Sequence, residues 1–275
     1  MNLENGLRAL RTSSLVVRIS AIVVLLAGIA QLVLGGIAVK QEYERIAEIE
    51  ELSRQNTYYG YQLQQRAIDQ QYNRSSSAFF IQGRFMPSED SMKPDAPGVI
   101  SLIVLLLSGL VFVGAALFWV FRANSNLAQV GIKSKYSPAL ATAAYLIPVA
   151  NLFLPFESMR ELHNRSHGEE EDFAHSPVED VTAWWTAMMV GMLIFSAMIV
   201  KFALDVGTNL VIMTPIWMEF TIIAFALVLL LGSAWLFGRL TRSITAAQAE
   251  YLPQVDTSAL AEAAPARPTV TIIGT

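Results

Sequence analysis

The sequence contains no cysteine, and only 15% of its 275 residues are charged. Without cysteine the chain can form no disulfide, no thiolate metal site and no thiol nucleophile. Soluble domains carry about a quarter charged residues, whereas here hydrophobic residues make up 53% and the mean hydropathy is +0.44. The lack of cysteine excludes a secreted domain stabilised by disulfides. The low share of charged residues, together with the high hydropathy, predicts an integral membrane protein.

Basic residues are few as well. Lys and Arg number 19 against 23 Asp and Glu, which gives a formal net charge of -4. Binding to nucleic acid needs a basic patch or stripe, and here the cations fall near the ends of apolar runs instead of along one face. We therefore expect no nucleic-acid partner.

Four apolar runs are long enough to cross the hydrocarbon core, which takes roughly 20 helical residues. Spans are predicted at residues 19–39, 99–122, 183–204 and 215–240, so the expected fold is an all-α membrane protein. For the first run a cleavable signal peptide is the alternative, because Gly36-Ile37-Ala38 resembles a cleavage site. The run exceeds the roughly 7–15 apolar residues of a signal core, which favours a span.

Polar segments separate the predicted spans. Residues 1–18 form an N-terminal lead, residues 40–98 a polar and partly helical extramembrane loop, and residues 123–182 a central block. Residues 241–275 continue the last helix and then become an Ala, Pro and Thr-rich tail that we expect to be disordered. In the first loop we expect Tyr58, Tyr59 and Tyr61 to pack a small subdomain.

The central block contains an apolar segment, residues 138–156, that Pro148 interrupts. Proline removes a backbone donor, and such a break is tolerated in a membrane only where protein or water covers it. A fifth span, a re-entrant hairpin and an interfacial helix pair all fit this segment. Just before it, Ser137 and Pro138 are typical of an N-cap and a first helical position.

The distribution of cations decides between these topologies. With four spans, the Lys and Arg residues that flank the spans outside the first loop all lie on one side of the membrane. They are Arg8, Arg11, Arg18, Arg122, Lys133, Lys135, Arg160, Arg165, Arg239 and Arg242. A fifth span would send the last two to the opposite side. Because cations concentrate in the cytoplasm, we predict four spans, cytoplasmic termini and a re-entrant or interfacial segment at 138–156.

A series of residues in and around the central block forms a recognisable motif. These are Phe118, Trp119, Arg122, Ala123, Asn126, Leu127, Gly131, Ser137, Pro138, Pro148, Asn151, Leu152, Pro155, Glu161, Leu162, Ser166, Trp184 and Trp185. Their spacing resembles the bacterial membrane family known as domain of unknown function 4328, over roughly residues 99–240. The resemblance implies a small multi-pass protein of the bacterial cytoplasmic (inner) membrane and implies no activity. Tyr145 and Leu146 depart from the tryptophan-aromatic pair expected before the proline.

Eight residues of this block form a candidate motif for binding lipid or a partner: Trp119, Arg122, Asn126, Pro138, Pro148, Asn151, Pro155 and Glu161. An arginine and two amides beside a broken helix suit a lipid headgroup or a small anion. The interpretation that we favour is structural: Arg122 snorkels toward water, while Asn126 and Asn151 pair with backbone groups freed at Pro138 and Pro148. The rings at the end of the second run, Phe118 and Trp119, are typical of the membrane interface.

Two further groups of titratable residues stand out. His163 and His167 are four residues apart, close to His175 and the acidic run 169–172, as in a zinc site. No metalloprotease motif accompanies them and Gly168 ends the helix, so we predict a solvated loop without metal or cofactor. Lys201 and Glu219 are predicted to pair as a clasp between the last two spans.

The sequence contains no Ser-His-Asp pattern, no Gly-rich phosphate loop and no ionisable residue at mid-depth of a span. No catalytic residue is therefore predicted. We expect a non-catalytic interaction, scaffold or regulatory protein that binds membrane lipid and other membrane proteins, or itself. A small permease with its substrate site at Pro148–Asn151 is the first alternative, and a metal-dependent enzyme at His163 and His167 is the second.

Overall fold

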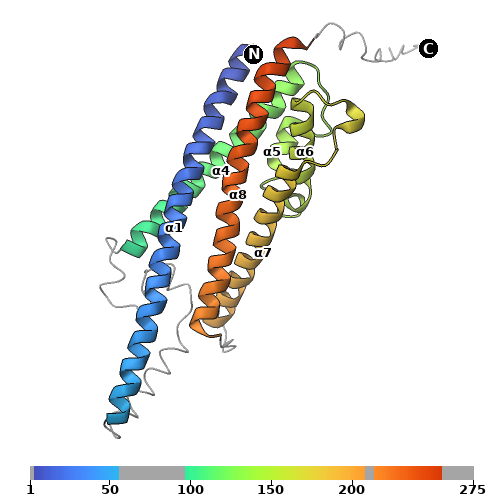
Figure 1. The fold of residues 1–275 in the computed structure, drawn as a ribbon. Helices are drawn as coiled ribbons and strands as arrows, with labels where there is room; N and C mark the ends of the chain where they lie inside the picture. Colours follow the sequence, from blue (N-terminus) through green and yellow to red (C-terminus); the bar gives the residue numbers. More distant parts are fainter. Residues whose placement is uncertain (1–2, 56–96, 208–213, 256–275) are drawn as a thin grey trace, which may run out of the picture. The chain divides into compact units, whose positions relative to one another are not determined.

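The computed structural model describes residues 3–55, 97–207 and 214–255, and within these residues all regular structure is helical (Figure 1). The helices are α1 (Leu3–Gln55), α4 (Pro97–Gln129), α5 (Pro138–Ala143), α6 (Leu154–Ser166), α7 (Glu179–Gly207) and α8 (Ile216–Tyr251). Short 3-10 turns occur at Ala150–Leu152 (η2), Glu171–Phe173 (η3) and Leu252–Gln254 (η4). The predicted all-α fold is confirmed for this part of the chain. The tyrosine group of the first loop and the C-terminal tail lie outside it.

Four of the helices are long and apolar enough to cross a membrane. Their candidate spanning stretches are Leu3–Lys40, Gly98–Gln129, Glu179–Lys201 and Trp217–Gln254. Each overlaps one of the runs predicted from the sequence. The chain therefore has the helices of a multi-pass membrane protein.

The chain divides into two compact units. Unit 1 comprises Met1–Leu15, Ala115–Val181 and Leu240–Thr275, and unit 2 comprises Val16–Gly114 and Thr182–Arg239. Unit 1 thus contains α5, α6 and most of the family-like motif. Unit 2 contains the long apolar stretches of α1, α4, α7 and α8.

Unit 2 is packed through small residues and aromatic rings. A Cβ added at Gly28 of α1 would lie 2.6 Å from the Leu231 side chain of α8, so glycine permits this close approach. Phe237 packs against Phe112 at 5.9 Å and against Trp184 at 5.4 Å between ring centroids. These contacts join α8 to α1, α4 and α7.

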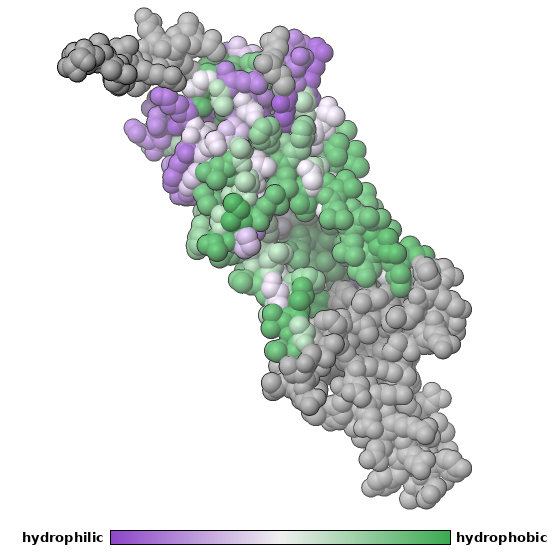
Figure 2. All heavy atoms as spheres, turned by 180° about the vertical axis from the view of Figure 1, so that it is seen from behind, coloured by the Kyte–Doolittle hydropathy of each residue, from purple (hydrophilic) through white to green (hydrophobic). Residues whose placement is uncertain are grey.

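The long apolar stretches of unit 2 are largely exposed. Only 6% of the most hydrophobic window of α4 and 11% of that of α7 are buried. Figure 2 shows hydrophobic residues over the long helices on the face that it draws, and hydrophilic residues gathered over parts of unit 1. A soluble monomer rarely exposes so large an apolar surface, whereas lipid solvates it.

A buried ion pair joins α7 to α8 in unit 2. Lys201 Nζ lies 2.6 Å from Glu219 Oε1, and the side chains are 14% and 7% exposed. The Thr214 hydroxyl also donates to this carboxylate. The predicted Lys201–Glu219 clasp is confirmed.

In unit 1, α5 and α6 pack against each other as a short hairpin. Ser137 accepts a hydrogen bond from the Leu140 N–H at 3.3 Å and Pro138 follows in the first turn of α5, which confirms the predicted helix start. Gly168, with φ +83°, ends α6 in the left-handed region that favours glycine. At 1.5 Å per residue, the six residues of α5 extend only about 9 Å.

Candidate functional site: a buried polar network and a surface pocket

Trp119 lies in the interior of unit 1. Its side chain is fully buried, and its indole N–H donates to the Thr245 hydroxyl of α8 at 3.0 Å. The neighbouring Phe118 is 53% exposed. Both rings were expected at the membrane interface. Phe118 therefore lies on the surface, whereas Trp119 is buried and links α4 to α8 by a hydrogen bond.

Gln248 of α8 is the centre of the buried network. Its amide donates to the Ala123 carbonyl of α4 and to the Ser166 hydroxyl of α6, each at 3.0 Å, and its Oε1 accepts from Asn126 at 3.4 Å. The Ser166 hydroxyl in turn donates to the Leu162 carbonyl at 2.6 Å. One side chain thus connects three helices, and the interpretation that Asn126 pairs with proline-freed backbone is wrong.

Asn126 also marks a close approach of α1. A Cβ added at Gly6 would lie 2.4 Å from Asn126 Oδ1, and this buried oxygen has no hydrogen-bond partner within the described residues. Only glycine at position 6 leaves room for the amide as it stands. The fit places α1 against the network.

The two glutamates of α6 hold the loop between α4 and α5. Glu161, 4% exposed, accepts the Lys135 N–H at 2.8 Å, while Glu157 accepts the Tyr136 hydroxyl at 2.5 Å and the Lys135 ammonium at 3.2 Å. The hydrogen bond from Tyr136, supported by Lys135, lowers the pKa of Glu157. The predicted binding residue Glu161 is thus part of a loop attachment.

The remaining motif residues do not gather into one site. Pro148 is exposed, Pro155 is buried in the first turn of α6, and Arg122 and Pro138 are partly buried. Asn151 donates its backbone N–H to the Ile147 carbonyl at 2.7 Å, but its side-chain amide has no hydrogen bond to any described residue. The expected pairing of this side chain with freed backbone is therefore wrong too.

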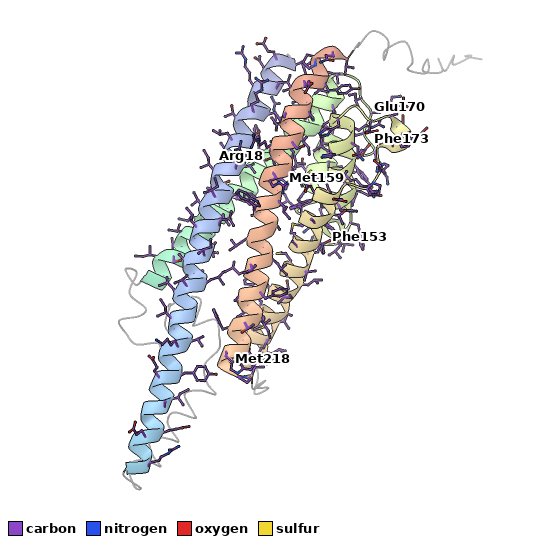
Figure 3. The ribbon with its side chains drawn as sticks, viewed as in Figure 1. Arg18, Phe153, Met159, Glu170, Phe173 and Met218 are labelled. Carbon is purple, nitrogen blue, oxygen red and sulfur yellow. The ribbon has the colours of Figure 1, made fainter. Side chains whose placement is uncertain are left out.

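Around the proline break the surface is apolar. Five large side chains are exposed: Leu146, Ile147, Val149, Leu152 and Phe153. Val149 and Phe153 have the largest exposed fractions of these, 74% and 71%; Figure 3 labels Phe153 beside the start of α6. We call these five side chains the apolar tip.

The histidines form a stacked pair. The rings of His163 and His167 lie 4.2 Å apart, and His167 Nδ1 lies 2.7 Å from the His163 carbonyl. Burial, followed by the charge of His167, lowers the pKa of His163. In the described ranges, no cluster of three or more His, Asp or Glu residues is placed to hold a metal ion. Asn164 instead donates to the carbonyls of Ala174 and Ser176, both at 3.1 Å, and so holds the following loop.

A surface pocket of about 380 Å³ lies between the end of α4 and the loop that leads to α5. Its lining includes Asn124, Ala128, Lys133, Ser134, Tyr136 and Pro138. Of these residues, the candidate binding motif predicted from the sequence included only Pro138. The signal that could have indicated the pocket was a cluster of lysine and serine residues directly before a proline that starts a helix.

The network also contains residues that sequence reasoning missed. Thr241, Thr245 and Gln248 lie on one buried face of α8. Their spacing of four and three residues is the signal that could have revealed them, because polar residues at helical spacing share one face.

Comparison with known proteins identifies a family that the chain matches. The model of the family described as domain of unknown function 4328 matches residues 94–246, which is more than half of the chain. No curated protein and no solved structure matches the chain significantly. The matched range includes Trp119, Glu161 and Thr245 but ends before Gln248.

Proposed function

Since the chain belongs to the family of domain of unknown function 4328, we propose that it is a non-catalytic membrane protein that binds membrane lipid through its central block and serves there as an interaction or scaffold protein. The observation that carries this proposal is the apolar tip. Large apolar side chains are exposed on a segment whose helices are too short to cross a membrane.

The apolar tip supports an interfacial position of residues 138–156. The six-residue helix α5 and the turn η2 are far shorter than the roughly 20 residues that a span requires. Transfer of a large apolar side chain from water to lipid contributes about 1.5–3 kcal/mol. Five such side chains left in water would instead form an aggregation-prone patch.

The polar residues of the block support a structural role. Asn126, Gln248 and Ser166 bind one another and backbone carbonyls, and Glu161 binds a loop N–H. Among the described residues, none of these groups forms the pair of a nucleophile and a base that acyl or phosphoryl transfer needs. The network therefore fits a rigid support for the surface of the block.

The topology that we propose places both termini in the cytoplasm of a bacterium, with the chain in the cytoplasmic membrane. The support for this is the even number of candidate spans, because four crossings would return the chain to the side on which it began. The cations of the N-terminal lead, of the central block and of the end of the last helix then lie on that side, as the positive-inside rule favours.

Association with other membrane helices is the second part of the proposal. The apolar stretch of α4 is the least buried of the four, and a Cβ added at Gly109 or Gly114 meets nothing within 4 Å. This surface leaves room for a further helix at close range.

The lack of cysteine permits a direct test of the apolar tip. A single cysteine at Val149, labelled with an environment-sensitive fluorophore, is expected to show blue-shifted emission and quenching by lipids brominated on their acyl chains. The matched control is a cysteine at Glu170, an exposed residue of the acidic loop, which is expected to show neither. Emission from position 149 that equals that from position 170 would contradict the proposal.

A further inference from the structure

Four residues that line the pocket between α4 and α5 carry hydrogen-bond donors for which the described residues offer no acceptor. The ammonium of Lys133 makes no ion pair with any described residue. The N–H groups of Lys133, Ser134, Tyr136 and Ser137 likewise have no acceptor in the described part of the chain. Between them, the Lys135 N–H is already bound by Glu161.

The two glutamates that hold this loop are bound elsewhere. Glu157 is bound by Tyr136 and Lys135, and Glu161 by the Lys135 N–H. Neither glutamate belongs to the lining. The lining is largely apolar but contains the Lys133 ammonium, and no carboxylate lies among the lining residues, so an anionic group bound there would meet a cation without a competing anion.

Asn124 contributes a buried side-chain acceptor to this lining. The residue is only 4% exposed, and its Nδ2 donates to the Val120 carbonyl at 2.9 Å, which orients the amide. Its Oδ1 has no partner among the described residues. A ligand that fits both features carries an anion and, close to it, a hydroxyl or ammonium donor.

The pocket lies just beyond the apolar run of α4, at the level along the helix where a lipid headgroup would lie. The apolar run of α4 ends at Phe121, and Asn124 follows about 4.5 Å further along the helix. A volume of about 380 Å³ is in the range of small-ligand pockets.

Resting on the proposed function, we propose that this pocket binds a phosphate ester that carries a hydroxyl, the chemistry of a phosphatidylglycerol headgroup. Lys133 and the loop N–H groups bind the phosphate oxygens. Asn124 Oδ1 accepts a hydrogen bond from the hydroxyl. A soluble ester such as glycerol phosphate has the same chemistry, so the experiment includes both.

The test is retention of lipid by the detergent-solubilised full chain, counted by native mass spectrometry. The probes are phosphatidylglycerol, phosphatidylcholine, which lacks a hydroxyl donor and a net charge, and glycerol phosphate. We expect preferential binding of phosphatidylglycerol, weakened about tenfold in Lys133→Gln by loss of one charge-assisted contact. Ala128→Phe, at an exposed lining position, is expected to block binding by filling the pocket.

Lys135→Gln is the matched control. It also removes one lysine charge, two residues from Lys133, but the ammonium of Lys135 is already paired with Glu157. It is expected to bind phosphatidylglycerol as the parent does. Binding of glycerol phosphate alone, lost in Lys133→Gln, would support the pocket with a soluble ligand. The proposal would be overturned if Lys133→Gln and Ala128→Phe both bound phosphatidylglycerol as the parent does. It would also be overturned if the parent did not prefer phosphatidylglycerol over phosphatidylcholine and did not bind glycerol phosphate.

Together with the Val149 label, this experiment distinguishes failure of the pocket proposal from failure of the proposed function. If the label at Val149 reports lipid while Lys133→Gln binds phosphatidylglycerol normally, the pocket assignment is wrong and the proposed function stands. If the label reports water while glycerol phosphate binds through Lys133, the proposed function is wrong and the pocket stands.

Discussion

Gln248 of α8 donates a hydrogen bond to the Ser166 hydroxyl of α6 at 3.0 Å, and both side chains are fully buried. The same amide nitrogen donates to the Ala123 carbonyl of α4. The end of the last long helix is thereby bound to the block that contains the apolar tip and the pocket.

Replacement of Gln248 by alanine is expected to destabilise unit 1. The Asn126 amide and the Ala123 carbonyl lose a partner in a buried setting, at a cost of about 1–3 kcal/mol for each unsatisfied group. Thermal unfolding in detergent should show a clearly lower midpoint. Gln254→Ala removes an exposed amide that bonds only within its own turn, and its midpoint should equal that of the parent.

Substitution of Gly6 by alanine is expected to disturb Asn126. The new Cβ would lie 2.4 Å from Asn126 Oδ1, so the amide must turn away from Gln248. We expect a loss of about 1–2 kcal/mol, which becomes smaller in an Asn126→Ala background because the clash is gone. A double-mutant cycle measures this coupling. Gly109→Ala, in open space on α4, is the control, and additive effects of Gly6→Ala and Asn126→Ala would contradict the predicted contact.

Removal of one partner of the Lys201–Glu219 ion pair is expected to lower the stability of the fold strongly. Lys201→Met leaves a buried carboxylate without its cation, and loss of one partner of a buried pair costs about 3–5 kcal/mol. The double variant Lys201→Met with Glu219→Gln should recover most of this loss. Unfolding midpoints of the three variants test the expectation. Arg8→Gln, which breaks an exposed pair with Glu4, should leave the midpoint unchanged.

The attachment of the loop at Glu157 is expected to weaken in acid. Its pKa lies below the ordinary value of 4.5, so the folded state favours the carboxylate. The contribution to stability is complete above pH 4.5 and is lost as the pH falls through the lower, folded pKa. Because this side chain is 36% exposed, the effect should be small. The hydrogen-exchange protection factors of residues 131–137, which compare each measured rate with the intrinsic rate at the same pH, should fall on acidification in the parent and be low at every pH in Glu157→Gln.

The proposed topology predicts the labelling of single cysteines in intact cells. A cysteine at Glu170 or at Ala259 should be protected from an impermeant maleimide and should react after the cells are opened, because both positions are assigned to the cytoplasm. A cysteine at Thr57 in the first loop should react in intact cells. Labelling at Ala259 in intact cells would rule out cytoplasmic termini.

The sequence alone was sufficient for the helical class, the four apolar helices, the family, the N-cap at Ser137 and the Lys201–Glu219 pair. These features depend on the length of apolar runs, on local turn chemistry and on charges at the ends of neighbouring spans, all of which can be derived from residues close in the chain. Only the tertiary structure decided that Trp119 is buried, that Asn126 pairs with Gln248, and that Asn124 and Lys133 line one pocket. A tryptophan or an amide at a helix end suits an interface and a buried network equally well. Which one it occupies depends on the helix that packs against it, here one that follows more than a hundred residues later in the chain.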